Sequence, residues 1–330
     1  MNAVDIRRLI SRRSLLRLGV QGVAFAAVGA LAGCARSPLR VAVSPWAGYQ
    51  FIALAEQEGW YAPDQVQLVK TATLGESAKA LAEARVDGAA LTLDEVLTLR
   101  ADGVPVEAIL IINVSAGGDA LLTRPGLGSL ADLAEKRIAV EDSSLGAVML
   151  HHALQAAGLA PDDVIIESMQ FDHVAAWEQL APDAILTYEP ALTRLEAQGL
   201  VRLFDSREIP MRILDVLVVR TGTLQRQGGA VRELIAGHFR ALDLWHSNPL
   251  DTGYRLAHLL GVQVEDVKRI FGGLDLPDAL YNRQYLSPPA IELTRAAREI
   301  AEIMTEADLL QRMPPLDGLF RPDGLPVEPA

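Results

Sequence analysis

Acidic side chains recur in the polar segments that follow the apolar runs of this sequence. Four of them, Asp94, Glu95, Glu189 and Asp215, stand there without a Lys or Arg beside them. A binding site for a small anion would normally contain a bidentate Arg or a Lys. The pattern therefore favours a neutral or cationic ligand with a planar or amine-bearing group. The alternative is that these carboxylates point to solvent.

Aromatic and hydroxyl side chains occupy the same kind of segment. Trp46 and Tyr49 flank a glycine in the first of them and are suited to stacking on a planar solute or to a cation–π contact. The alternative is that both rings only close the first helix onto a sheet. Ser77, Ser143 and Ser144 stand where helices are expected to begin. We expect these serines to cap helices, at positions where free backbone N–H groups also attract anions.

The elements that must position these residues alternate between short strands and helices, which predicts an α/β fold with mostly parallel strands. Strands are expected at 39–43, 66–69, 89–91 and 106–114, with helices at 49–58 and 78–85. Ligands of open α/β sheets bind at the carboxyl ends of the strands. That rule selects the candidate ligand-binding residues Ser44, Trp46, Tyr49, Ser77, Thr92, Asp94, Glu95, Ser143, Ser144, Tyr188, Glu189 and Asp215.

The strand pattern then restarts in the middle of the chain. The segment 137–141 echoes 40–44, and 183–189 echoes 87–94, each of the latter ending in Thr, an apolar or aromatic residue and a carboxylate. Segments 119–124 and 215–220 are predicted to cross between the two halves. We therefore expect one lobe from residues 38–121 and 213–330, and a second from 122–212. Five prolines after residue 312 predict an extended tail.

The first 34 residues are typical of an export signal. Arg12 and Arg13 precede an uncharged apolar run that ends in Leu31-Ala32-Gly33-Cys34. We expect export through the twin-arginine route and removal of residues 1–33. Cys34 is then expected to carry lipid, with residues 34–37 as the tether in the periplasm. A basic leader also suits the general secretion route. An uncleaved N-terminal membrane anchor is the alternative.

Composition and motifs exclude several other classes of protein. The net charge is −12, and it is −16 for a chain that begins at Cys34, so nucleic acid binding is not expected. Cys34 is the only cysteine, and neither a phosphate-binding loop nor a nucleophile elbow is present. We expect no catalytic residues, no cofactor and no metal. Among the histidines, only His173 precedes a helix near the expected site.

These residues resemble a known family. Ser44-Pro45-Trp46-Ala47-Gly48-Tyr49, then 118–122 with 129–140, and then Asp183 to Pro190 are similar in order and spacing to the nitrate/sulfonate/taurine-type solute-binding proteins, a family that includes binders of thiamine pyrimidine precursors. The resemblance implies a two-lobed periplasmic binding protein fold of the second structural type, with two hinge strands and ligand in the cleft.

The resemblance also implies the partners. The protein is expected to be a monomer that delivers a small-molecule solute to an ABC permease and its ATPase. It is not expected to be an enzyme. A lipoprotein of the same build that reports ligand to a membrane signalling receptor is the alternative function.

Overall fold

A computed structural model describes residues 37–170 and 172–326 of the chain. The export signal, Cys34 and residues 1–36 as a whole lie outside the described residues. The strands are β1 (Leu39–Val43), β2 (Val66–Lys70), β3 (Gly88–Thr92), β4 (Val106–Ser115), β5 (Asp119–Thr123), β6 (Arg137–Glu141), β7 (Ile165–Met169), β8 (Ala184–Tyr188), β9 (Val201–Asp205), β10 (Leu214–Arg220) and β11 (Leu274–Asp275).

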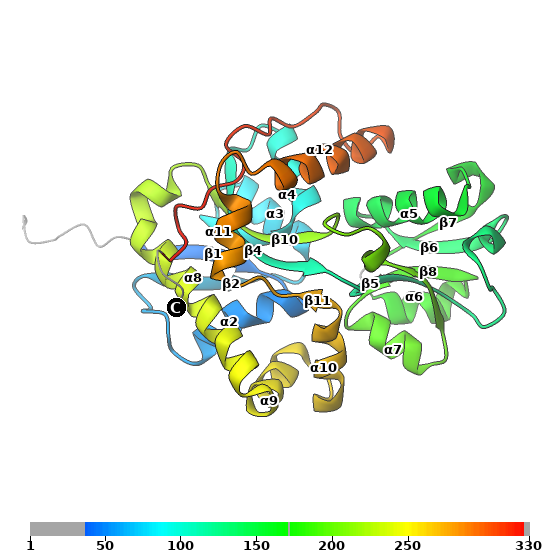
Figure 1. Ribbon diagram of the computed structural model, residues 1–330, viewed down its shortest axis with the longest axis horizontal. Coiled ribbons are helices and arrows are strands. Elements are labelled where there is room, and N and C mark those ends of the chain that lie inside the picture. Colours follow the sequence, from blue (N-terminus) through cyan, green and yellow to red (C-terminus); the bar gives the residue numbers. More distant parts are fainter. Residues whose placement is uncertain (1–36, 171, 327–330) are drawn as a thin grey trace, which may run out of the picture. The chain divides into compact units, whose positions relative to one another are not determined.

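The helices follow these strands and cover the sheets (Figure 1). They are α2 (Gln50–Gln57), α3 (Leu74–Ala82), α4 (Leu93–Ala101), α5 (Ser144–Ala157), α6 (His173–Leu180), α7 (Ala191–Ala197), α8 (Thr223–Ser247), α9 (Pro249–Leu260), α10 (Val264–Gly272), α11 (Ala279–Leu286) and α12 (Ile291–Glu306). The strands and the first helix expected from the sequence are confirmed to within a few residues.

The strands form two sheets that share the arrangement of five strands, and the first sheet has β11 in addition. The first has the order β11-β4-β10-β3-β1-β2, and the second has the order β7-β6-β8-β5-β9. In each sheet three parallel strands (β2, β1, β3 and β7, β6, β8) are followed by an antiparallel one, β10 or β5. The predicted α/β fold is therefore confirmed, and so is the repeat within the chain, but the strands are not mostly parallel as expected, because β10 and β5 pair antiparallel on both of their sides.

The repeat extends to hydrogen bonds that hold equivalent strands together. Asp87 accepts a bond from the backbone N–H of Arg40 at 3.0 Å, and Asp183 accepts the equivalent bond from Arg137 at 3.0 Å. Each aspartate thus ties the start of β3 or β8 to the start of its parallel neighbour. These equivalent hydrogen bonds explain why the segments 87–94 and 183–189 resemble one another in sequence.

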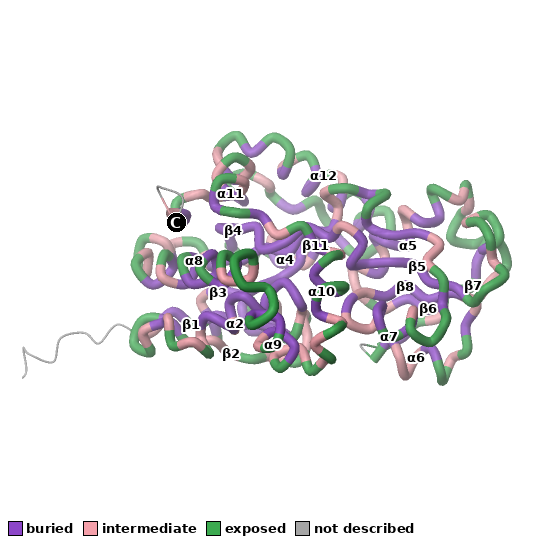
Figure 2. The backbone as a smooth tube through the Cα atoms, turned by 60° about the horizontal axis from the view of Figure 1, so that its bottom comes forward, coloured by how far each residue is buried: buried purple, intermediate pink, exposed green. Residues whose placement is uncertain are grey.

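Burial follows the position of each strand. The middle strands β4, β5 and β8 are almost wholly buried, as Figure 2 shows, because helices cover both of their faces. The edge strand β7 leaves Ile165 and Ile166 about half exposed. Around the second sheet the core divides in two, with Met149 of α5 packed on one face and Trp177 of α6 on the other.

The two connections between the sheets are short. The chain leaves β4 at Ser115 and enters β5 at Asp119, then returns between β9 and β10 through residues 206–213. The two segments predicted to cross between the halves, 119–124 and 215–220, do not themselves cross. The first forms β5 of the second sheet, and the second forms most of β10 of the first sheet. The first connection therefore precedes the boundary expected at residue 121, because β5 pairs along its whole length with β8.

Two further local predictions are decided by the structure. Ser77 does not cap α3; Thr73 does, accepting a bond from the backbone N–H of Glu76. The helix therefore starts earlier than the sequence pattern indicated, and Ser77 lies inside it. The tail is extended up to residue 326 as predicted, but it is also part of the core, because Leu319 is fully buried and backbone bonds join residues 319 and 321 to Ala108.

Candidate functional site

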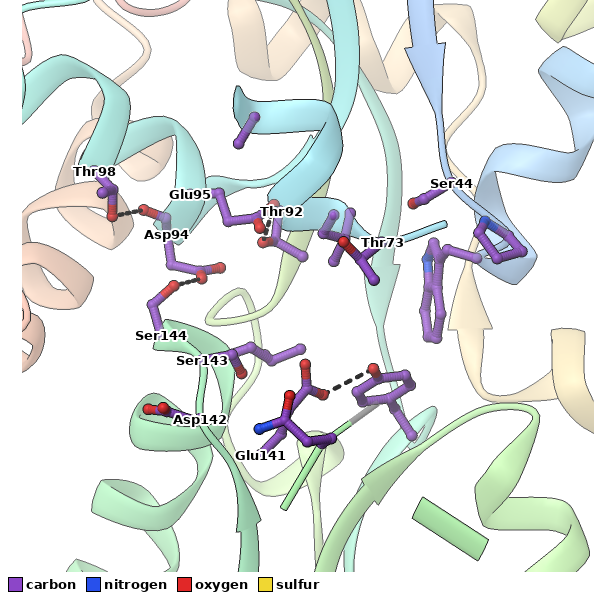
Figure 3. A pocket seen from close by; sticks show the side chains of 18 of the residues that line it. Ser44, Thr73, Thr92, Asp94, Glu95, Thr98, Glu141, Asp142, Ser143 and Ser144 are labelled. Atoms are coloured by element: carbon purple, nitrogen blue, oxygen red, sulfur yellow. Dashed lines mark hydrogen bonds between the residues drawn. The ribbon is translucent and has the colours of Figure 1, made fainter. Parts of the chain in front are cut away.

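The carboxyl ends of strands from both sheets surround one cavity of about 480 Å³ (Figure 3). Residues from both sheets, and from the helices that follow their strands, line this cavity. The lining residues are Ser44, Pro45, Trp46, Thr73, Leu74, Gly75, Ala78, Thr92, Asp94, Glu95, Thr98 and Leu99 from the first sheet's side, and Glu141, Asp142, Ser143, Ser144, Leu145, Met169, Gln170, Tyr188, Glu189 and Pro190 from the second's.

The first wall is built from the ends of β1 and β3. Ser44 directly follows β1, and Thr92 is the last residue of β3. Asp94 and Glu95 lie in the first turn of α4, where the partial positive charge of the helix start favours carboxylates. The Thr92 hydroxyl donates to Oε2 of Glu95 at a distance of 3.4 Å.

The second wall is built from the ends of β6 and β8. Glu141 ends β6, and Ser143 caps α5 by accepting a bond from the backbone N–H of Gly146. Tyr188 ends β8 and is followed by Glu189. Glu189 is held by the backbone N–H and the hydroxyl of Thr193 in α7, at 3.2 and 2.9 Å.

Two contacts join the walls across the cavity. The Ser144 hydroxyl, at the start of α5, donates a hydrogen bond to the Asp94 carboxylate of α4 (Figure 3). The rings of Trp46 and Tyr188 meet edge to face, with centroids 5.8 Å apart and planes at 81°. The cavity is therefore bounded by groups that come from both sheets and touch each other.

Glu141 lies at the centre of a hydrogen-bond network. The Tyr188 hydroxyl donates to its Oε2 at 2.8 Å, and Nε2 of His173 lies 3.1 Å from the same oxygen. Nδ1 of His173 in turn lies 3.1 Å from the Thr187 hydroxyl. Burial alone would raise the pKa of Glu141, but the bonds from His173 and Tyr188 outweigh it and lower that pKa. Glu141 is therefore held as a carboxylate.

The other carboxyl groups of the cavity behave differently. Burial raises the pKa of Glu95 well above its usual value, and the nearby Asp94 adds to the rise. Burial also raises the pKa of Asp94, against the opposing effect of the Ser144 bond, and raises that of Glu189 to about 6. Among the described residues that line the cavity there is no Lys, Arg or His. The site therefore holds acid groups without a cation to pair them.

A second chain of contacts lies beneath the first wall. The Tyr49 hydroxyl donates to Asp215 at 2.5 Å, Asn113 donates to the same carboxylate at 2.7 Å, and Trp46 donates to Asn113 at 3.2 Å. Asp215 also lines a recess of about 20 Å³ that Trp46, Tyr188 and Asp119 share. This chain fixes the orientation of the Trp46 ring against the sheet.

Nine of the predicted site residues line the cavity, and three do not. Tyr49 is fully buried on Asp215, and Asp215 faces only the smaller recess. Ser77 is fully buried and its hydroxyl lies 2.6 Å from that of Thr71.

Sequence reasoning missed other lining residues, among them Thr73, Asp142, Gln170 and above all Glu141. A signal for Glu141 was present, because it occupies the position of Ser44 in the repeated strand motif.

The fold and the site together define a class of protein. Two α/β sheets that share an arrangement of five strands, joined by two short connections and closing on a shared cavity, form the periplasmic binding protein fold. The periplasmic aliphatic sulphonate binding protein SsuA from Escherichia coli has the same fold, with a TM-score of 0.73 at 16% identity, over 86% of this chain and 97% of that one.

The chain belongs to the family described as NMT1/THI5 like, whose sequence profile matches residues 46–252. It is 30% identical over 181 residues to the taurine-binding periplasmic protein of Escherichia coli (strain K12), covering 52% of this chain. That match spans 56% of the relative, so the chain aligns with about half of the curated relative's length.

An enzyme also shares the fold. The desulfurization enzyme DszB has a TM-score of 0.63 at 18% identity, over 88% of this chain and 97% of that one. The fold therefore serves binding and catalysis alike, and the side chains of the cavity must decide between them.

Proposed function

We propose that this chain is the solute-binding protein of an ABC importer, capturing a small organic solute between its two lobes and delivering it to the permease. The observation that carries the proposal is the cavity, which is lined from both sheets and crossed by the Ser144–Asp94 bond. A ligand that touches both walls favours the closed arrangement by its differential affinity for it. The kinship with a taurine-binding periplasmic protein supports this function.

The lobes in this proposal are the two sheets with their helices, and the connections at 116–118 and 206–213 are the hinge. Export, removal of residues 1–33, lipid attachment at Cys34 and a periplasmic location belong to the same proposal and rest on the sequence of the leader. Among the described residues, no helix combines the length and the apolar character needed to cross a membrane. A Cys34→Ala variant is expected to leave the membrane fraction while wild type stays in it.

We propose capture without chemistry, although one structural neighbour is an enzyme. The cavity lining offers carboxylates and hydroxyls but no cysteine, histidine or lysine among the described residues. The His173 ring is 1% exposed and is engaged by Glu141 and Thr187, so it cannot reach a solute directly. The solute should therefore be recovered unchanged after prolonged incubation with the protein.

The solute in this proposal is neutral or cationic. Sulfonates and nitrate are fully charged anions, and the cavity presents five carboxylates with no cationic side chain among the described residues. The free N–H groups at the starts of α4 and α5 favour an anion, but carboxylates next to them oppose one.

The experiment that tests the function has two parts. Native mass spectrometry of the purified full-length chain is expected to show a retained small molecule. Small-angle scattering before and after that molecule is removed is expected to show a change in the radius of gyration. Identical scattering curves would contradict a clamp that closes on its ligand.

A further inference from the structure

We propose that the solute carries an ammonium group, bound between Glu95 of the first wall and Glu141 of the second, and that this charge holds the two walls together. The inference deepens the proposed function and rests on it, because it names the class of solute that the same cavity takes. Its basis is the charge of the two walls, the free acceptor atoms between them and the pair of rings that flanks the space.

Both walls carry acid groups that face the same space. Asp94 and Glu95 come from α4, and Glu141 comes from the end of β6 across the cavity (Figure 3). The carboxylate of Glu141 is close enough to raise the pKa of Asp94, after the larger effect of burial. Closing the cavity brings like charges together, which costs free energy unless a cation or protons come between them.

The carboxyl groups differ in how many hydrogen bonds they accept from the protein itself. Asp94 accepts from Ser144, and Glu189 accepts twice from Thr193. Glu95 accepts only from Thr92 among the described residues, from its backbone and, at a long 3.4 Å, from its hydroxyl, so acceptor capacity of the carboxyl is unused. It is therefore the carboxylate with most to gain from a donor on the ligand.

A second, independent observation points to a polar group on the ligand, for which both unpartnered atoms can act as acceptors. Ser44 lines the cavity and is only 4% exposed, yet its hydroxyl has no hydrogen-bond partner within the described residues (Figure 3). Oδ2 of Asp119, a residue of the neighbouring recess that is 2% exposed, likewise lacks one among those residues. Buried polar atoms are rarely left unpaired. An ammonium group has three donors and no acceptor, which matches a space bounded by acceptor atoms.

The aromatic pair suits the body of such a molecule. Trp46 from the first wall and Tyr188 from the second meet edge to face, so one ring from each wall borders the space beside the carboxylates. Aromatic faces attract a desolvated cation and pack against an apolar or planar body. The helix starts of α4 and α5 oppose a cation, but each carries only about half a charge. Two carboxylates, each with a full charge when ionised, outweigh them.

Three probes of one shape and different charge separate this inference from its alternatives. Benzylamine, benzyl alcohol and phenylmethanesulfonate share a ring and a methylene and carry a cationic, a neutral and an anionic group. Calorimetry with the purified full-length chain, freed of retained solute, is expected to rank benzylamine first and the sulfonate last. Glu95→Gln and Glu141→Gln are each expected to lower the affinity for benzylamine by about tenfold and the affinity for benzyl alcohol by less than about twofold.

The control variant is Asp102→Asn, which removes one negative charge from the far end of α4, where Asp102 is exposed. It is expected to change the affinity for benzylamine by less than about twofold. Equal or tighter binding of the sulfonate, equal effects of the Gln variants on all three probes, or no binding of benzylamine would overturn the ammonium site. In each case a retained neutral solute that closes the protein in scattering would leave the proposed function intact, and a retained anion that does so would leave solute capture intact while contradicting the neutral or cationic solute. No retained solute and no closure with any probe would overturn both.

Discussion

Ser144 donates a hydrogen bond to Asp94, and this bond joins the first turn of α5 to the first turn of α4 across the cavity. The two helices follow strands of different sheets, so the bond exists only while the two walls are together. Asp94 is 6% exposed and has no cationic side chain within hydrogen-bond reach among the described residues. We therefore expect this bond to act as a latch between the two walls.

The Ser144→Ala variant is expected to open the protein in the absence of ligand. The variant removes the hydroxyl donor and leaves the buried Asp94 carboxylate without this hydrogen bond. The loss raises the free energy of the closed arrangement by about 2 kcal/mol. A larger radius of gyration in small-angle scattering is the expected result. The matched control is Ser143→Ala, which removes the α5 cap, costs about 1 kcal/mol of stability and leaves the radius unchanged. If both variants scatter like wild type, Ser144 is not a latch.

Stability is expected to fall as the pH rises from 6.5 to 8. Burial raises the pKa of both Asp119 and Asp215 to about 7, whereas an unfolded aspartate titrates near 3.9. The folded protein thus keeps protons that the unfolded chain has already lost, and rising pH removes that advantage. The loss is about 1 kcal/mol for each carboxyl, measured by urea denaturation at the two pH values.

Two histidines oppose this effect at lower pH. Burial lowers the pKa of His152 and His238 to about 4, so below pH 6.5 the unfolded chain binds their protons first, which offsets the stability that the protonated carboxyls of Asp119 and Asp215 add as the pH falls. The Asp215→Asn variant is expected to show a smaller loss than wild type between pH 6.5 and 8, because one of the carboxyls with a raised pKa is gone. Asp102→Asn, at an exposed position, keeps the whole loss. A wild-type stability that rises over this range would contradict the argument.

The sequence predicted the strands well and the walls of the site in outline, for reasons visible in particular residues. The strand β3 reads as apolar because it is buried on both faces, and the residues after it must be polar because they border a cavity. Asp94 and Glu95 could therefore be placed from the end of a strand alone. The repeat between 87–94 and 183–189 was recognisable because each segment forms the same bonds in its own sheet.

Other features depend on contacts that no local pattern contains. Tyr49 and Asp215 stand at strand and helix boundaries like the lining residues, but they bond to each other beneath the wall. Ser77 precedes an apolar helix face, as a cap would, yet Thr73 makes the capping bond one turn earlier. The role of His173 depends on a partner 32 residues away, Glu141, whose position in the repeat was the only sequence signal for it.

The first connection between the sheets makes close contact with a second glycine, Gly273. A Cβ on Gly273 would lie 2.8 Å from the backbone nitrogen of Gly118 and 2.9 Å from its Cα. Gly118 is part of the first connection between the sheets, so the backbone there must move if the contact is filled. Gly273→Ala is expected to lower the free energy of unfolding by about 1–3 kcal/mol in urea denaturation.

The adjacent Gly272 provides the control. A Cβ there meets nothing within 4 Å, and the residue lies at the end of α10. Gly272→Ala is therefore expected to be neutral or to stabilise the protein by up to about 1 kcal/mol. Equal losses in the two variants would show that the contact with Gly118 is not what matters.

Gly48 is expected to be essential for the orientation of Trp46. A Cβ at this position would lie 1.7 Å from Oδ1 of Asn113, the atom that accepts the Trp46 ring N–H. Gly48→Ala must therefore displace the Asn113 side chain, which also donates to Asp215 at 2.7 Å. We expect a loss of about 2 kcal/mol in stability and a shift in tryptophan fluorescence, because both bonds to buried groups break.

Gly75→Ala is the matched variant, since Gly75 also lines the cavity but a Cβ there meets only the Thr73 hydroxyl at 3.9 Å. It is expected to keep the stability and the fluorescence of wild type. The decisive comparison is the affinity for a ring-bearing ligand, because only Gly48→Ala moves a ring of the cavity wall. Equal affinities in the two variants would mean that the chain from Trp46 through Asn113 to Asp215 does not orient the ring that meets Tyr188.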